Sequence, residues 1–435
     1  MFGVQQVANL VAPPPEGRMA GAAAAFDAVT TAAEQQLDGW LKQTYQIGNG
    51  LQNGLMDVMM LRAPAIDSSS IMRMAAQMQS GPIFEVAIKY VMPSIGWVDS
   101  FLVNRKDGPG TQQEFANKLY IIMLVTQVHG SLGADAASQP ITALAERMMT
   151  FETFPRLWAV EGLGNYYGDR ALEQSNHADV TGLLSDPATS SLPPWTLTML
   201  HAGIGMSFAK EVLGDLTPSS PPEAFRTAIQ RFASLCRNSS RRGYTGAALE
   251  SLGLATRTLY SNLIPQFDRE IAQVAPEVYG YFWHGAGRAV YFDPMNMLPS
   301  FNAPWRALAR LAQDAPNEQA RLNAISGFCW AVTVVNMRNP EVMEAFLRHH
   351  SKTLASDGAF ANGLTSSLLM RYDTSPTDQN IDSFIHHAPN SDPELASTWR
   401  RMVTEPCQRA ITQVYPPLKQ GPSLEELFHY VPRAL

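Results

Sequence analysis

Two glutamates and two histidines recur in similar surroundings in the middle of the chain. Glu161 and Glu250 each stand two residues before a Leu-Gly pair, in "AVEGLGNYYGDRAL" and "AALESLGLATRTLY". His201 and His284 each precede a Gly/Ala stretch, in "MLHAGIGMSFAKEV" and "YFWHGAGRAVYFDP". Imidazole exchanges protons near neutral pH, and carboxylates orient imidazoles or bridge hard cations. If these residues meet, they predict a proton-transfer or two-metal site.

Arg288 lies among aromatic residues in "YFWHGAGRAVYF" and is the next residue to consider. A guanidinium can stack on an aromatic ring or fork onto a carboxylate, and both uses would place it near a pocket. The alternative is a half-buried arginine paired with Asp293 or Glu250. The candidate catalytic residues are therefore His284, His201, Glu161 and Glu250, and the candidate substrate-binding residues are Arg288, Trp283 and Tyr291.

The matching segments predict an internal duplication, with halves at residues 151–216 and 241–340; "VHGSLGA" at His129 is a fainter third copy. Glycine inside a helix costs about 1 kcal/mol relative to alanine, so the repeated glycines need a compensating contact. Close packing of helices within a duplicated unit would supply it. So would a pocket on which both halves converge, and the sequence leaves both interpretations open.

Other carboxylate–histidine groups are simpler to interpret as ordinary pairs on helix surfaces. They are Glu426 with His429, Asp382 with His386, and Glu344 with His349 and His350. No Gly-x-Ser-x-Gly, phosphate-binding Gly-rich loop or His-Glu-x-x-His motif occurs, which removes the usual support for serine hydrolases, nucleotidases and zinc proteases. We assign no metal ligands, and the sequence names no cofactor.

These residues must be positioned by helices. Apolar residues recur at three- and four-residue spacing in residues 26–45, 114–128, 221–237, 304–313, 340–350 and 393–415, whereas alternating β-branched runs are almost absent. Several of these segments begin at proline, which the first turn of a helix tolerates. The sequence predicts an all-α protein, either a multi-helix globular body or a solenoid-like array. The predicted parts are an N-terminal arm (1–18), an N-terminal helical region (19–150), the duplicated core (151–340) and a C-terminal helical region (341–435).

The overall composition narrows the range of partners. The formal charge of −7 over 435 residues, without a long basic run, argues against nucleic acid. The basic stretch at residues 237–243 could hold a phosphate, but a solvated loop is the simpler interpretation. The three cysteines are widely spaced, as expected of reduced thiols. No apolar run approaches the roughly 20 residues of a membrane span, and we expect a cytoplasmic protein.

Three stretches together resemble an uncharacterised bacterial family of enediyne biosynthesis proteins: "RRGYTGAALESLGLA", "YGYFWHGAGRAVYFDP" and "DAPNEQARLNAISGFCWAVTVVN". The similarity covers roughly residues 241–336. Where that family tends to have Glu-Gly-Ala-Ala, this chain has Thr245-Gly246-Ala247-Ala248, and its glutamate is Glu250. The resemblance implies bacterial specialised metabolism near a polyketide pathway, and it brings no reaction or cofactor with it.

Two functions follow as expectations. The first is an enzyme, or an enzyme-like accessory protein, that holds a small hydrophobic, acyl or polyketide-like substrate between helical repeats. In it His284 is the general acid/base, Arg288 anchors an anionic group, and Glu161 and Glu250 orient the histidines or hold a metal. The second is a non-enzymatic helical scaffold or effector that binds a protein partner through an apolar groove, with the Gly/His segments purely structural. The sequence does not decide whether the chain is an enzyme.

Overall fold

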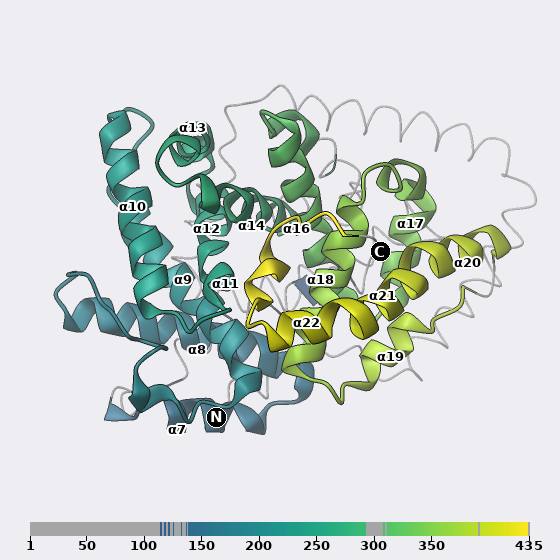
Figure 1. Cartoon of the computed structure of the whole chain (residues 1–435), viewed down its shortest axis with the longest axis horizontal. Helices are drawn as coiled ribbons and strands as arrows, with labels where there is room; N and C mark the ends of the chain where they lie inside the picture. The colour runs from purple at the N-terminus through teal and green to yellow at the C-terminus, as the bar shows by residue number, and fades with distance from the viewer. Residues whose placement is uncertain are drawn as a thin grey trace, which may run out of the picture.

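The computed structural model describes residues 138–292, 311–389 and 392–433, together with 114, 117, 118, 121, 125, 132, 136 and 308. Every regular element in these residues is helical and none of them is in a strand, which confirms the all-α prediction (Figure 1). The predicted arm, the helix predicted over 26–45 and His129 lie outside the described residues. The domain boundaries stay a prediction.

Many helices begin where proline and short polar residues predict a start. Helices α10 (Pro222–Ser239), α17 (Pro340–Leu354) and α20 (Pro393–Trp399) have proline in their first turn. Asp392 caps α20 by accepting hydrogen bonds from the backbone N–H groups of Glu394 and Leu395. Such caps satisfy N–H groups that have no partner inside the helix.

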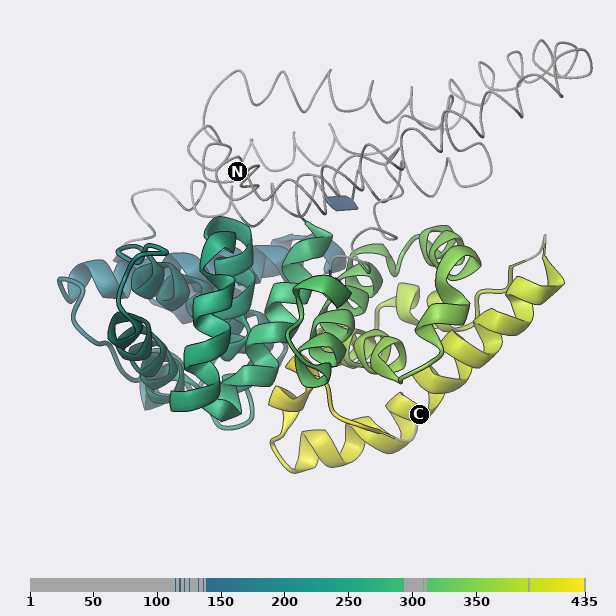
Figure 2. The ribbon, with the colours of Figure 1, turned by 90° about the horizontal axis from the view of Figure 1, so that it is seen from above.

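A row of helices packed in chain order forms the body of the molecule (Figure 2). Each contacts the next, and α11 (Thr245–Leu249) leads directly into the third. The helices of this row are α8 (Thr153–Gln174), α9 (Leu197–Leu213), α12 (Ser251–Leu259), α14 (Tyr279–Tyr291), α16 (Glu318–Asn336) and α18 (Ala359–Thr374).

The remaining helices flank this row. Helices α10 and α13 (Ile264–Val274) pack on each other beside its first half, and α17 packs on α16 and α20 beside its second. Residues 393–420 form a continuous rod in which π-helical turns at Arg400–Thr404 and Ala410–Val414 separate α20, α21 (Glu405–Arg409) and α22 (Tyr415–Gln420). Prolines follow each π-turn, and because proline lacks the N–H of the regular ladder, the widened turns fall beside them. The shorter helices are α7 (Ile141–Arg147) and α19 (Gln379–Ile385).

Glycines let the helices of the row touch backbone to backbone. A Cβ placed on Gly285 of α14 would lie 2.1 Å from the carbonyl oxygen of Glu250, and one on Gly327 of α16 would lie 1.9 Å from that of His284. Both distances are far inside van der Waals contact, so only glycine fits at these points. Close helix packing therefore compensates these glycines, as the first interpretation of the sequence proposed.

Among the described residues, no helix combines the length and the apolar character needed to cross a bilayer.

Candidate functional site

The predicted site residues come from neighbouring helices of the row. Glu161 lies in the middle of α8, and Glu250 lies at the joint between α11 and α12. His284 and Arg288 are one turn apart on α14, so both side chains face the same side of that helix. The structure brings all four side chains together in one network.

Glu250 is the centre of this buried ionic network. Its Oε1 lies 2.7 Å from Nδ1 of His284, and its Oε2 lies 2.9 Å from Nη1 of Arg288. Nη2 of the same guanidinium lies 3.1 Å from Oε1 of Glu161. The side chains of Glu250 and His284 have an exposed fraction of 0%. The guanidinium also lies over the ring of Trp330 of α16, 4.7 Å from its centroid.

The surroundings move the pKa values of the two carboxyls in opposite directions. Burial raises the pKa of Glu161, and the negative charge of Glu250 adds to this while Arg288 opposes it. Burial also pushes the pKa of Glu250 upward, but the charge of Arg288 and the hydrogen bond from His284 outweigh burial and hold that pKa below its ordinary value. Glu250 is therefore the firmly ionised carboxylate, and Glu161 is the one that accepts a proton more readily.

One nitrogen of His284 is left over. An ionised Glu250 can only accept, so Nδ1–H of His284 donates to it. Within the described residues, Nε2 of His284 is buried and has no hydrogen-bond partner, and the same is true of Nε of Arg288 and Nε1 of Trp330. Three unsatisfied nitrogens thus belong to side chains that lie against one another.

The helices seal this network. Gly285 contacts the carbonyl of Glu250 on one side of α14, and Gly327 contacts the carbonyl of His284 on the other. At these contacts the backbones of α12, α14 and α16 leave no space between them for a substrate. A reactant could reach His284 only after the packing opens.

His201 does not join the network. Its Nδ1 donates to the carbonyl of Leu197 at 2.6 Å, and its Nε2 accepts the backbone N–H of Arg241 at 3.0 Å. The ring stacks on Tyr244 with 5.3 Å between centroids. Burial lowers the pKa of His201 to about 4, which leaves the ring neutral at pH 7. Both ring nitrogens are therefore used to hold the start of α9 against the loop after α10.

The two aromatic candidates also face elsewhere. Nε1 of Trp283 donates to Asp268 of α13 at 2.9 Å. The hydroxyl of Tyr291 accepts from Nδ2 of Asn336 at 2.7 Å, and Nζ of Lys118 lies 3.9 Å from the centroid of its ring. The polar atoms of Trp283 and Tyr291 are therefore bonded to residues outside the network.

The polar positions continue along the row beyond the predicted residues. Ser326 precedes Gly327 on α16, and Asn362 precedes Gly363 on α18; a Cβ on Gly363 would lie 2.1 Å from the carbonyl oxygen of Ser326. The Ser326 hydroxyl donates to Oδ1 of Asn362 at 2.8 Å. A polar residue followed by glycine was the sequence signal for both positions, and it was not applied to Ser326 or Asn362. The internal duplication itself stays a prediction.

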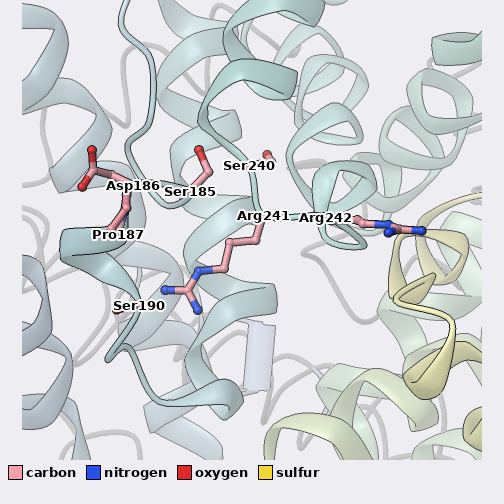
Figure 3. Close-up of a pocket in the computed structure, with 7 residues that line it drawn as sticks. All are labelled: Ser185, Asp186, Pro187, Ser190, Ser240, Arg241 and Arg242. Atoms are coloured by element: carbon pink, nitrogen blue, oxygen red, sulfur yellow. The ribbon is translucent and has the colours of Figure 1, made fainter.

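The basic stretch after α10 lines a pocket of about 350 Å³ on another part of the surface (Figure 3). The Arg241 guanidinium is held by the carbonyls of Leu184, at 2.8 Å, and Thr189. The Arg242 side chain points away from the Arg241 guanidinium. The two guanidinium groups therefore do not converge on a phosphate. The lining residues are Ser185, Asp186, Pro187, Ser190, Ser240, Arg241 and Arg242.

The other predicted groups do not gather into a metal site. Asp382 and His386 form an exposed pair with 3.1 Å between Oδ1 and Nδ1, and Glu344 pairs with His387. His429 lies against Tyr281, with 4.5 Å between ring centroids. In the described part of the chain, no group of three or more His, Cys, Asp or Glu side chains is placed to hold a metal ion.

No family model, curated protein or solved structure matches this chain.

Proposed function

We propose that the chain is a non-enzymatic helical scaffold that binds a protein partner, and that the Glu161–Arg288–Glu250–His284 network fixes the packing of its helices. The observation that carries this proposal is the complete enclosure of the Glu250–His284 pair between helices in backbone contact. A buried, mutually paired set of charges contributes specificity of packing, because any other register would leave a charge unpaired. Helical arrays of this kind use their extended outer surfaces for binding.

Replacement of the network by apolar side chains tests the proposal. The triple variant Glu161→Leu, Glu250→Met and Arg288→Met removes both carboxylates and the guanidinium of the network while keeping much of the volume. If the chain is a scaffold, cells that carry a folded triple variant should form as much of the pathway's specialised metabolite as cells that carry the parent chain. If the triple variant folds with the parent's circular dichroism spectrum but product formation is lost, the network has a chemical role and the scaffold proposal is wrong.

The second candidate is the enzyme of specialised metabolism, acting on an acyl or polyketide-like substrate. The unpartnered Nε2 of His284 favours it, because a carboxylate on Nδ1 and a free Nε2 are the arrangement of a general base. In this function Arg288 anchors an anionic group. The resemblance to enediyne biosynthesis proteins supports the metabolic setting, and a cytoplasmic location belongs to the same proposal.

The stability of His284→Ala and the product it supports together separate the two candidates. A structural His284 predicts that His284→Ala lowers the melting temperature by several degrees, since a buried Glu250 loses a hydrogen bond. A catalytic His284 predicts that product is lost as well, even under conditions in which His284→Ala remains folded. An unchanged melting temperature with full product formation would contradict both roles.

A further inference from the structure

Residues 424–433, here called the strap, lie across the second half of the row. The strap begins with the short helix Leu424–Phe428, and from His429 onward it is non-helical and extended, with φ −153° and ψ 164° at His429. It contacts α11, α14 and α18, and Figure 1 shows it in yellow, crossing beside α16 and α18. From His429 onward the strap is therefore an extended peptide, and it is bound on a surface made by consecutive helices.

Two buried asparagines on neighbouring helices hold the backbone of the strap. Oδ1 of Asn323 on α16 accepts the N–H of Tyr430 at 2.7 Å. Nδ2 of Asn362 on α18 donates to the carbonyl of Val431 at 2.8 Å. Both bonds are to main-chain atoms, and such bonds give affinity for an extended chain without reading its side chains. Asn323 and Asn362 form what we call the asparagine track.

The asparagine track is oriented by its own helices. Nδ2 of Asn323 donates to the carbonyl of Gln319 at 2.9 Å, which leaves Oδ1 to face the strap. Oδ1 of Asn362 accepts from Ser326 at 2.8 Å, which leaves Nδ2 to face the strap. The amide groups are thus set for a peptide by contacts that do not involve the strap, and preorganisation of this kind lowers the entropy lost on binding.

Side chains of the strap add contacts of a definite kind. Phe428 lies 6.0 Å from Trp330 between ring centroids, and Tyr430 donates its hydroxyl to the carbonyl of Asp357 at 3.2 Å. Arg433 donates to the Ser366 hydroxyl at 3.3 Å. Pro432, which precedes Arg433, is exposed and keeps the chain extended. Beyond the buried Phe428, the surface therefore fits an extended segment in which an aromatic residue is followed by an aliphatic residue and proline.

The extended half of the strap is the part that can be displaced. Tyr430, Val431 and Arg433 are only half-buried, whereas Leu427 and Phe428 are buried. Few buried apolar contacts and partly exposed hydrogen bonds mark segments that open at low free energy. The asparagines would then face water, which can satisfy them until another peptide binds.

We infer that the asparagine track is a binding surface for an extended segment of a protein partner, and that the strap occupies it as an intramolecular competitor. The inference rests on the proposed scaffold function and names the class of partner: an unstructured segment with the aromatic–aliphatic–proline pattern. A partner can bind only while the strap is off the asparagine track. The apparent affinity of the track for a partner is therefore reduced to the fraction of time for which the track is free.

Peptide binding to a shortened chain tests the inference. The probe is a fluorescent peptide with the sequence of the extended half of the strap, HYVPR, and the protein is a variant that ends at Phe428, so that the buried helix of the strap stays in place. We expect this variant to keep its helical circular dichroism and to bind the probe saturably, and the full chain to bind it at least about tenfold more weakly. Asn323→Ala with Asn362→Ala in the shortened chain should abolish binding. Asn238→Ala is the matched control, since Asn238 is exposed on α10.

Variants of the probe and of the full chain complete the test. Alanine in place of Tyr430 in the probe should weaken binding, and a scrambled probe should not bind. If the shortened chain does not fold, Tyr430→Pro in the full chain removes the N–H that Asn323 accepts and should strengthen probe binding. A folded shortened chain that ignores the probe, binding that survives the double asparagine variant, or a Tyr430→Pro chain no better than the parent would overturn the inference. None of these results bears on the ionic network, so the scaffold proposal would stand or fall separately.

Discussion

His284 and Glu250 are joined twice, once through their side chains and once through the backbone. Nδ1 of His284 lies 2.7 Å from Oε1 of Glu250, and Gly285, the next residue after His284, packs on the carbonyl of the same glutamate. The backbone contact sets the distance between α12 and α14, and the side-chain contact fixes how the helices are rotated. Polar contact and glycine contact therefore define one geometry together.

Arg288→Met should destabilise the chain by about 3–5 kcal/mol, because it leaves two buried carboxylates without their cation. Urea unfolding followed by circular dichroism measures the change. Arg400→Met is the control: the Arg400 side chain is 80% exposed, so its loss should cost less than about 0.5 kcal/mol. Equal effects of the two variants would show that the network contributes nothing to stability.

Gly327→Ala should be strongly destabilising, by about 1–3 kcal/mol or more, because its Cβ would collide with the rigid backbone carbonyl of His284. Gly214→Ala is matched to it. At Gly214 the nearest atom to an added Cβ is the Lys210 oxygen at 3.6 Å, so alanine fits there. Thermal unfolding of both variants decides the point, and a Gly327→Ala chain as stable as the parent would rule out the backbone contact.

Stability should fall as the pH drops from about 6.5 toward 4, in part because of His201. The pKa of this ring is lowered to about 4 by burial, so folding favours its neutral form. The contribution is fully present above the unfolded pKa near 6.5 and is lost as the pH falls through the folded value. It amounts to about 3 kcal/mol for a group of this kind. His201→Gln should unfold with a correspondingly weaker dependence on pH between 7 and 4; an unchanged dependence would exclude His201 as a source.

The three cysteines should not react with a thiol reagent while the chain is folded. Cys236, Cys329 and Cys407 are buried and free, and burial raises the pKa of each thiol. The thiolate is the reactive form, and it is therefore scarce and shielded. Titration with a chromogenic disulfide should give no rapid reaction in buffer and three equivalents in guanidinium. Rapid native labelling would show that the helices open far more readily than their packing indicates.

The sequence predicted the helices well because proline starts and apolar spacing are local signals. The grouping of Glu161, Glu250 and His284 was also accessible, since their segments resemble one another. His201 belongs to a similar segment, but it bonds to the carbonyl of Leu197 on its own helix and to a loop, and segment similarity does not reveal which partners a ring will find. Its placement depends on tertiary contacts.

Helix geometry alone could have separated Trp283 from Arg288. Trp283 precedes Arg288 by five residues, which at 3.6 residues per turn puts the two side chains about 140° apart. The structure accordingly has Trp283 bonded to Asp268 of α13 and Arg288 inside the network. The asparagine track was not accessible in this way. Asn323 and Asn362 are single polar residues in largely apolar helices, and their partner is a segment about 70 to 107 positions away.

The ion pair between Arg288 and Glu161 joins residues 127 positions apart, whereas most contacts of the row link each helix only to its neighbour. Arrays with purely nearest-neighbour contacts can fray helix by helix from either end. Here α8 cannot detach without leaving the buried guanidinium of Arg288 on α14 without its partner Glu161. The stretch from α8 to α14 should consequently melt as one cooperative unit, with hydrogen exchange in its amides governed by a single shared opening event rather than by a gradient along the chain.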